Sequence, residues 1–238
     1  MSTLAPMRDR VLAGLLAGTS PAGPAARLSI AIFHRVLPQP DPLFPGEVWR
    51  ERFDELCRWY AAWFHVLPLD EAAERLQAGT LPSRALCITF DDGYADNHDL
   101  AMPILQAHGL CATFFIATGF LDGGRMWNDT VIEVVRRCQG SALELGDIGV
   151  DGLGRIELET LDARRQSIDR ILGAIKYLDP VQRQSLVVDR IAERAGGTFP
   201  DNLMMRSEQV SALLRISANV TGHFGNVTDL GLSAGLRG

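Results

Sequence analysis

The sequence lacks clusters of basic residues, and this absence excludes one class of partner. Its 23 Lys and Arg are outnumbered by 29 Asp and Glu, which gives a formal net charge of -6 at pH 7. Binding to nucleic-acid phosphates needs a basic face. We therefore expect no nucleic-acid partner, and a neutral polymer or a small molecule fits the composition better.

Cysteine is scarce, and long apolar segments are absent. Four cysteines lie far apart without Cys-x-x-Cys spacing: Cys57, Cys87, Cys111 and Cys138. We expect free thiols, because two of them sit in apolar strand-like runs. The apolar stretch Val11–Gly18 is short for a secretion signal and too short to span a bilayer. We expect a helix packed on the domain, no transmembrane segment and a cytoplasmic protein.

The first half of the chain alternates between strand and helix patterns. A length of 238 residues, 47% of them hydrophobic, suits a globular domain with a sizeable core. Short apolar runs predict strands at 28–33, 66–67, 85–90 and 111–117, and apolar residues at helical spacing predict helices at 53–64, 70–77 and 99–107. This alternation predicts βαβ units and a parallel sheet.

The second half has a different pattern. Helical apolar stripes cover 127–138, 161–178 and 180–195, with a strand conceivable only at 155–158. We expect a mostly helical excursion without paired strands over Trp127–Ala195. A helix at 207–214 and a short strand near 217–221 then restore the alternation.

Two adjacent carboxylates follow the predicted strand Ala85–Phe90. Asp91 and Asp92 repel each other unless a cation or a shared proton stabilises them, so their position predicts a metal or general-base site. Gly93 then allows a sharp turn. The alternative is a solvated turn or a helix N-cap.

Four segments together resemble one known family: Ile32–Val36, Phe90–Gly93, Pro103–Gly119 and Leu203–Leu213. They are similar to the polysaccharide deacetylases related to chitin-oligosaccharide deacetylases, with their NodB homology domain. The resemblance implies an α/β fold, a distorted (β/α) barrel whose site lies at the carboxyl ends of the strands. We expect here an incomplete barrel with a helical insertion.

That resemblance implies one domain over 1–238, in four parts. These are an N-terminal helix and linker (1–27), barrel strands and helices (28–119), the helical insertion (120–206) and a truncated return to the barrel (207–238). An incomplete barrel exposes apolar strand edges, which can pair with a second copy of the chain.

The implied activity is metal-dependent hydrolysis of acetyl groups from an N-acetylated or O-acetylated glycan, with zinc as the expected metal. By position in the family motif, Asp91 is the general base and Asp92 a metal ligand. The family's other ligands are two histidines spaced His-x-x-x-His. His223 matches the first, whereas Val227 occupies the second position and offers no lone pair. A zinc site normally has three protein ligands.

Three further residues are candidates for lining the site. His34 ends the first strand and faces the same edge as Asp91, although a structural, hydrogen-bonded role is the alternative. His98 is either a pocket residue or a surface residue. Trp127 offers an aromatic ring for sugar stacking, or merely marks the start of a helix capped by Asn128 or Asp129.

Two other functions compete with deacetylation. The chain stops at Gly238, before the family's Arg-x-Pro-aromatic and Leu-x-His segments, which favours a truncated, inactive member that at most binds glycan. A phosphohydrolase using Asp91 and Asp92 on magnesium is a third interpretation. The lack of a phosphate-binding glycine loop or a nearby Lys weighs against it.

Overall fold

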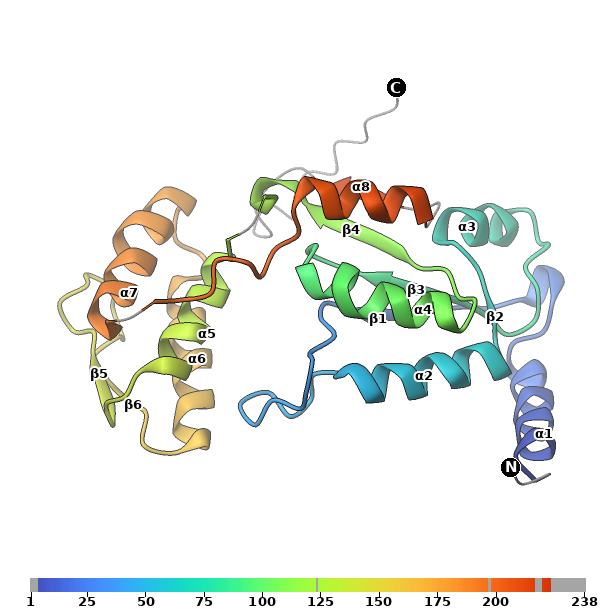
Figure 1. Cartoon of the computed structure of the whole chain (residues 1–238), viewed down its shortest axis with the longest axis horizontal. Coiled ribbons are helices and arrows are strands. Elements are labelled where there is room, and N and C mark those ends of the chain that lie inside the picture. The colour runs from blue at the N-terminus through green and yellow to red at the C-terminus, as the bar shows by residue number, and fades with distance from the viewer. Residues whose placement is uncertain (1–3, 123, 197, 217–219, 224–238) are drawn as a thin grey trace. The chain divides into compact units, whose positions relative to one another are not determined.

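The computed structural model describes residues 4–122, 124–196, 198–216 and 220–223 (Figure 1). These residues form two compact units. The first contains residues 4–40, 47–121, 205–216 and 220–223, and the second contains the rest. None of the described helices is long and apolar enough to cross a membrane.

The first unit is built on a parallel sheet. Its strands are β1 (Leu28–Phe33), β2 (His65–Val66), β3 (Ala85–Phe90), β4 (Thr113–Ala117) and β7 (Val220–His223). Its helices are α1 (Leu4–Thr19), α2 (Arg50–Trp63), α3 (Leu69–Gln77), α4 (Met102–Ala107) and α8 (Ser207–Ile216), with a π-helical turn at Asn97–Ala101 and short 3-10 turns at Gly23–Ala25 and Thr118–Phe120. The predicted helix near the N-terminus is present.

The strand order β1-β3-β4-β7, with β2 paired to the start of β3, confirms the predicted α/β fold with a parallel sheet. The described residues do not close this sheet into a barrel, so the expected barrel is present only as an open sheet. The predicted bounds of β1 and β3 are the observed ones.

A cluster of aromatic rings fixes one face of the sheet. Parallel register pairs Phe33 with Phe90, and their ring centroids lie 5.4 Å apart. Phe53 of α2 meets Phe33 edge-on at 5.2 Å, and Phe114 of β4 stacks on Phe90 at 5.1 Å. Such ring pairs stabilise beyond their buried area. The cluster therefore holds the carboxyl ends of β1 and β3 against the start of β4.

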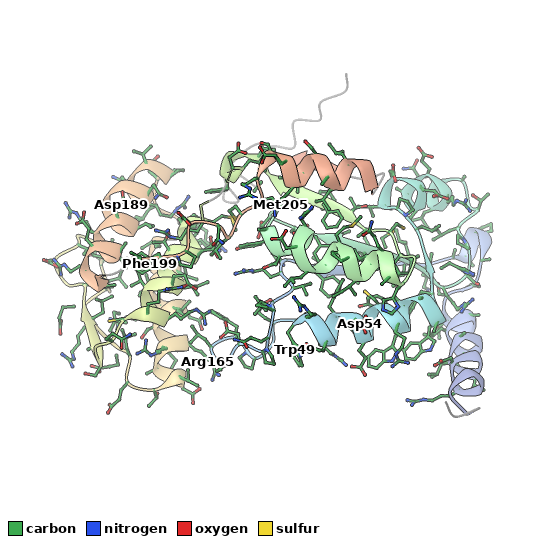
Figure 2. All side chains as sticks on the ribbon, in the orientation of Figure 1. Trp49, Asp54, Arg165, Asp189, Phe199 and Met205 are labelled. Carbon is green, nitrogen blue, oxygen red and sulfur yellow. The ribbon has the colours of Figure 1, made fainter. Side chains whose placement is uncertain are left out.

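The segment after β1 returns to the sheet at the start of α2. The Leu37 amide donates to the Val48 carbonyl at 2.8 Å, and the Arg50 amide donates to the Leu37 carbonyl at 2.8 Å. Trp49, which pairs with Leu37, stands immediately before α2 (Figure 2). Residues 41–46, between these contacts, belong to the second unit.

The opposite face of the sheet is covered less completely. Ala85 and Cys87 of β3 are buried against Ala72 and Leu81, whereas Ile30 and Ile32 of the edge strand β1 are 48% and 61% exposed. An apolar edge strand of this kind suits pairing with a second copy, which stays a prediction. All four cysteines are free thiols, as predicted.

The second unit contains four helical segments and a small sheet. Its elements are α5 (Trp127–Arg137), β5 (Ala142–Glu144), β6 (Arg155–Glu157), α6 (Leu161–Ile175), a π-helical turn at Gln182–Val188 and α7 (Asp189–Ala195). β5 and β6 pair antiparallel, with Leu143 opposite Ile156. The expectation of no paired strands was wrong, because a three-residue strand is too short for its periodicity to be visible.

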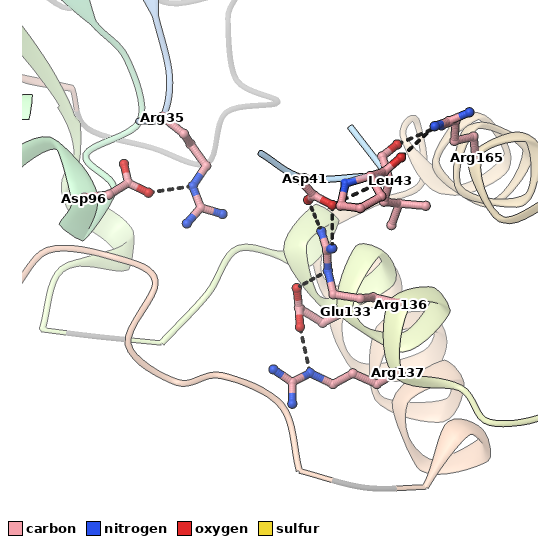
Figure 3. Close-up of polar contacts among 9 residues, drawn as sticks. Arg35, Asp41, Leu43, Asp96, Glu133, Arg136, Arg137 and Arg165 are labelled. Carbon is pink, nitrogen blue, oxygen red and sulfur yellow. Dashed lines mark hydrogen bonds and ion pairs between the residues drawn. The ribbon is translucent and has the colours of Figure 1, made fainter. Parts of the chain in front are cut away.

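Ion pairs attach residues 41–46 to the helices of the second unit (Figure 3). Arg136 donates from both terminal nitrogens to the Asp41 carboxylate, at 3.0 and 2.7 Å. Glu133 accepts from Arg136 Nε at 2.9 Å and from Arg137 Nε at 2.7 Å, and Arg165 Nε donates to the Leu43 carbonyl at 3.0 Å. Leu43 is thereby buried in the core of this unit.

Candidate functional site

The turn Asp91-Asp92-Gly93 is tied to its neighbours by backbone hydrogen bonds. The Asp91 amide donates to the Phe33 carbonyl of β1 at 2.8 Å. The Asp92 carbonyl accepts from Ala117 of β4 at 3.1 Å, and the Gly93 carbonyl accepts from Met205 at 2.9 Å. Three separate segments therefore fix the position of the acidic pair.

Local backbone geometry explains why a glycine follows the acids. Asp92 has φ +73° and Gly93 has φ +82°, so two consecutive residues adopt the left-handed conformation. A Cβ at Gly93 would lie 3.1 Å from Ile116 Cγ2, closer than ordinary van der Waals contact. Only glycine meets both conditions at this position without strain.

Burial and two neighbouring charges act on the Asp92 carboxyl. Burial raises the pKa of the Asp92 carboxyl above its ordinary value, the charge of His34 lowers it in part, and the neighbouring Asp91 raises it again. A buried carboxyl beside a second acid disfavours its own ionised form. The pair therefore lacks full charge compensation, which a bound cation would supply.

His34 reaches this edge because β1 and β3 end in register. Phe33 pairs with Phe90, so His34 and Asp91 are the next residues on adjacent parallel strands. The His34 side chain is exposed, and its carbonyl accepts a hydrogen bond from Asn97 Nδ2 at 2.9 Å. Its imidazole is thus open to solvent at the edge where Asp91 and Asp92 lie.

The backbone of His223 lies at the same edge. His223 ends β7 and is the register partner of Ala117, whose amide donates to the Asp92 carbonyl. The His223 side chain and Val227 lie outside what the structure describes. The backbones of Asp92 and His223 are thus linked through Ala117, whereas the convergence of their side chains and their roles stay predictions.

The other two candidates make local contacts. His98 Nδ1 lies 2.7 Å from Asp99 Oδ1, and Gln209 Nε2 donates to that same oxygen at 2.8 Å. Trp127 begins α5 in the second unit, where Asp129 accepts from the Met126 amide at 3.0 Å and caps the helix. The guanidinium carbon of Arg183 lies 4.6 Å from the centre of the Trp127 ring. Trp127 thus begins a helix, as one interpretation expected, and a site-lining role for either residue stays a prediction.

Sequence reasoning missed Asp96 and Asn97, which hold the segment that carries His34. Asp96 accepts from Arg35 Nε at 2.8 Å (Figure 3) and from the Val36 amide at 3.2 Å. The available signal was weak, since an Asp four residues after Asp92 is ordinary at a helix start. Only the hydrogen bonds of the folded structure show that these residues hold the segment from His34 to Val36.

The donor types at this edge suit a divalent cation. Within the described residues, no three His, Cys, Asp or Glu side chains form a group that could hold a metal ion, and the His223 side chain is outside that set. Asp92 offers a partly buried carboxylate with incomplete charge compensation. A carboxylate combined with imidazole nitrogens is a donor set that zinc accepts.

The acidic pair lies at the carboxyl edge of a parallel sheet, where the sites of α/β enzymes usually lie. Residues 78–151, which contain Asp91, Asp92 and Gly93, match the family model described as Polysaccharide deacetylase. This segment is therefore similar to the polysaccharide deacetylases, and the resemblance predicted from the sequence is confirmed over these residues. The match does not extend to His34 or His223.

Individual relatives agree with this relation. The chain is 31% identical over 93 residues to the Bacillus subtilis protein YxkH, provisionally named a polysaccharide deacetylase; the aligned part is 38% of this chain and 32% of that one. The chain thus spans about a third of the length of this curated relative.

Solved structures give weaker likenesses. The Streptococcus pyogenes deacetylase PplD in complex with acetate is 24% identical, over 40% of this chain and 44% of that one, with a TM-score of 0.36. A de-N-acetylase from Aggregatibacter actinomycetemcomitans is 15% identical, over 87% of this chain and 97% of that one, also with a TM-score of 0.36. The family relation rests on the sequence match.

Proposed function

We propose that this protein is a metal-dependent deacetylase that removes acetyl groups from an N-acetylated or O-acetylated glycan. The observation that carries the proposal is the Asp92 carboxyl, partly buried beside Asp91 and near His34, inside the segment that matches the deacetylase family. Such a site favours a cation, and the family relation indicates the kind of bond that is cleaved.

Each residue has a role that its chemistry supports. Asp91 acts as the general base and accepts the proton of the attacking water. Asp92 and His223 would hold the metal, for which zinc is the best match to the donors. When bound, the metal supplies Lewis-acid polarisation of the acetyl carbonyl. His34, at the same edge, offers a second nitrogen donor and thereby a third ligand in place of the absent histidine at position 227.

A direct assay tests this proposal. Purified protein with added zinc is incubated with acetylated chito-oligomers, and released acetate is measured for the wild type, Asp91→Asn and Asp54→Asn. Asp54 is an exposed carboxylate on α2 that pairs with His108, so it is a matched control (Figure 2). We expect Asp91→Asn to lose activity by about a hundredfold or more and the control to keep it. Equal activity of the three proteins would overturn the proposal.

A second candidate is a protein that binds glycan without turnover. Val227 favours it, because this residue replaces a ligand in the family's His-x-x-x-His spacing. This candidate predicts no acetate release in the same assay. It also predicts oligomer binding and less than one zinc per chain when these are measured on the same protein. Stoichiometric zinc together with acetate release would exclude it.

A further inference from the structure

Two adjacent side chains, those of Asp96 and Asn97, bind the segment that carries His34. Asp96 accepts hydrogen bonds from Arg35 Nε at 2.8 Å and from the Val36 amide at 3.2 Å. Asn97 donates to the His34 carbonyl at 2.9 Å and to Asp96 Oδ1 at 3.2 Å. Three consecutive residues, His34 to Val36, are thus bound by one Asp-Asn pair.

This pair is buried to an extent that is unusual for such polar groups. The Asp96 side chain is 10% exposed and Asn97 is fully buried. Asn97 Oδ1 has no hydrogen-bond partner in the described part of the structure. A buried polar atom without a partner typically costs about 1–3 kcal/mol, and an apolar residue would avoid that cost. The hydrogen bonds of Asn97 to His34 and Asp96 therefore explain its presence better than a gain in stability does.

The local backbone directs Asn97 toward His34. Asn97 begins a π-helical turn, Asn97–Ala101, which starts four residues after Gly93 and leads into α4. π-helical turns are rare and occur frequently at functional sites. The bond from Asn97 ends on the main chain of His34, so it fixes the position from which the imidazole extends.

From these contacts we infer that Asp96 and Asn97 are positioning residues, which hold His34 at the acidic pair formed by Asp91 and Asp92. The inference rests on the proposed function, because it concerns how His34 serves that site. The parallel register of β1 and β3 makes His34 and Asp91 the next residues on adjacent strands, so His34 lies at the edge that carries the pair. Loss of these bonds would loosen the main chain of residues 34–36, while the bond from the Asp91 amide to the Phe33 carbonyl would still join the end of β1 to the acidic turn.

A double-mutant cycle separates positioning from general stability. Asn97→Ala and Asp96→Asn are each made alone and in the His34→Ala background, with Asp54→Asn as the control, and acetate release is measured. We expect each single variant to lower kcat by about tenfold with little change in KM. In the His34→Ala background the same changes should cause no further loss. Equal losses in both backgrounds would overturn the inference.

A second measurement does not depend on activity. The imidazole carbon–proton signals of the five histidines are recorded by NMR, and His34→Ala identifies the signal of His34. We expect Asn97→Ala and Asp96→Asn to shift and broaden that signal, and Asp54→Asn to leave it unchanged. An unchanged His34 signal in the folded variants would overturn the inference. If the wild type releases no acetate, the proposed function fails while this measurement still decides the positioning role.

A conservative variant and an unfolding measurement distinguish loss of positioning from loss of folding. Asp96→Asn keeps the size of the side chain and its acceptor for the Val36 amide, and it removes only the charge opposite Arg35. Thermal unfolding followed by circular dichroism shows whether each protein is folded at the temperature of the assay. A folded Asp96→Asn with wild-type kcat and an unchanged His34 signal would contradict the role of Asp96.

Discussion

The Asp92 carbonyl accepts a hydrogen bond of 3.1 Å from the amide of Ala117. Ala117 is in turn the register partner of His223 in the neighbouring strand β7. One residue of β4 therefore links the backbones of the two proposed metal ligands. The sheet sets their relative position, and long loops play no part in it.

The glycine of the acidic turn is expected to be essential for folding of the first unit. Gly93→Ala combines a left-handed φ of +82° with a Cβ only 3.1 Å from Ile116 Cγ2. We expect a loss of about 2–4 kcal/mol in the free energy of unfolding, since the backbone strain and the overpacking add. Urea denaturation followed by tryptophan fluorescence measures it.

Gly109→Ala is the matched control. Gly109 has φ +65° and nothing within 4 Å of an added Cβ, so only the backbone strain applies. We expect a loss of about 1 kcal/mol. If both variants lose the same amount, the contact with Ile116 is not what restricts position 93.

The raised pKa of Asp92 predicts how stability changes with pH when no metal is present. Burial raises this pKa above its ordinary value, so the unfolded chain binds fewer protons than the folded chain between the two pKa values. Stability then falls as the pH rises through that range. We expect metal-free Asp92→Asn to melt at a higher temperature than the wild type at pH 7, with the difference smallest below roughly pH 4.

Adding zinc should reverse the order of the two proteins. A ligand that binds only the folded state stabilises it, so zinc is expected to raise the melting temperature of the wild type and not that of Asp92→Asn. The two titrations are run side by side with the same protein preparations. An equal effect of zinc on both proteins would show that Asp92 is not a ligand.

The Arg136–Asp41 pair is expected to stabilise the second unit. Burial raises the pKa of Asp41, but the hydrogen bonds from Arg136 and Leu43 lower it more, so the pKa lies below its ordinary value. Arg136→Met leaves the Asp41 carboxylate, which is 12% exposed, without its bidentate partner. We expect a loss of about 1–3 kcal/mol at pH 7. The loss should shrink as the pH falls through the pKa of Asp41.

Arg155→Met is the control for this change. Arg155 pairs with Glu144 and Glu157 at an exposed surface, where ion pairs contribute little. We expect no measurable change in its chemical denaturation curve. An equal loss in both variants would mean that burial of Asp41 is not the cause.

The sequence predicted the regions with strong periodicity. Apolar runs bounded by turn residues located β1 and β3 correctly, because buried parallel strands have a pattern that few other segments share. The acids after β3 were predicted as a site for the same reason, since a buried strand is an unusual place for paired charges.

Contacts between distant segments could not be predicted in this way. Asp96 meets Arg35 across 61 residues, and Arg136 meets Asp41 across 95. Neither pair has a local signal, because an Asp at a helix start and an Arg near a helix end are ordinary. The short strand β5 was missed because three residues show no period.

The last prediction concerns position 227, where the family spacing calls for a histidine and this chain has valine. Zinc prefers three protein ligands with water, and an imidazole four residues after His223 would complete that set. We expect Val227→His to bind zinc at least about tenfold more tightly than Val227→Ala, by isothermal calorimetry. The gain should vanish in the double variant Asp92→Asn/Val227→His, because the set of three ligands would again be incomplete. If Val227→His and Val227→Ala bind zinc equally, position 227 is not next to the metal, and His34 becomes the better candidate for the third ligand.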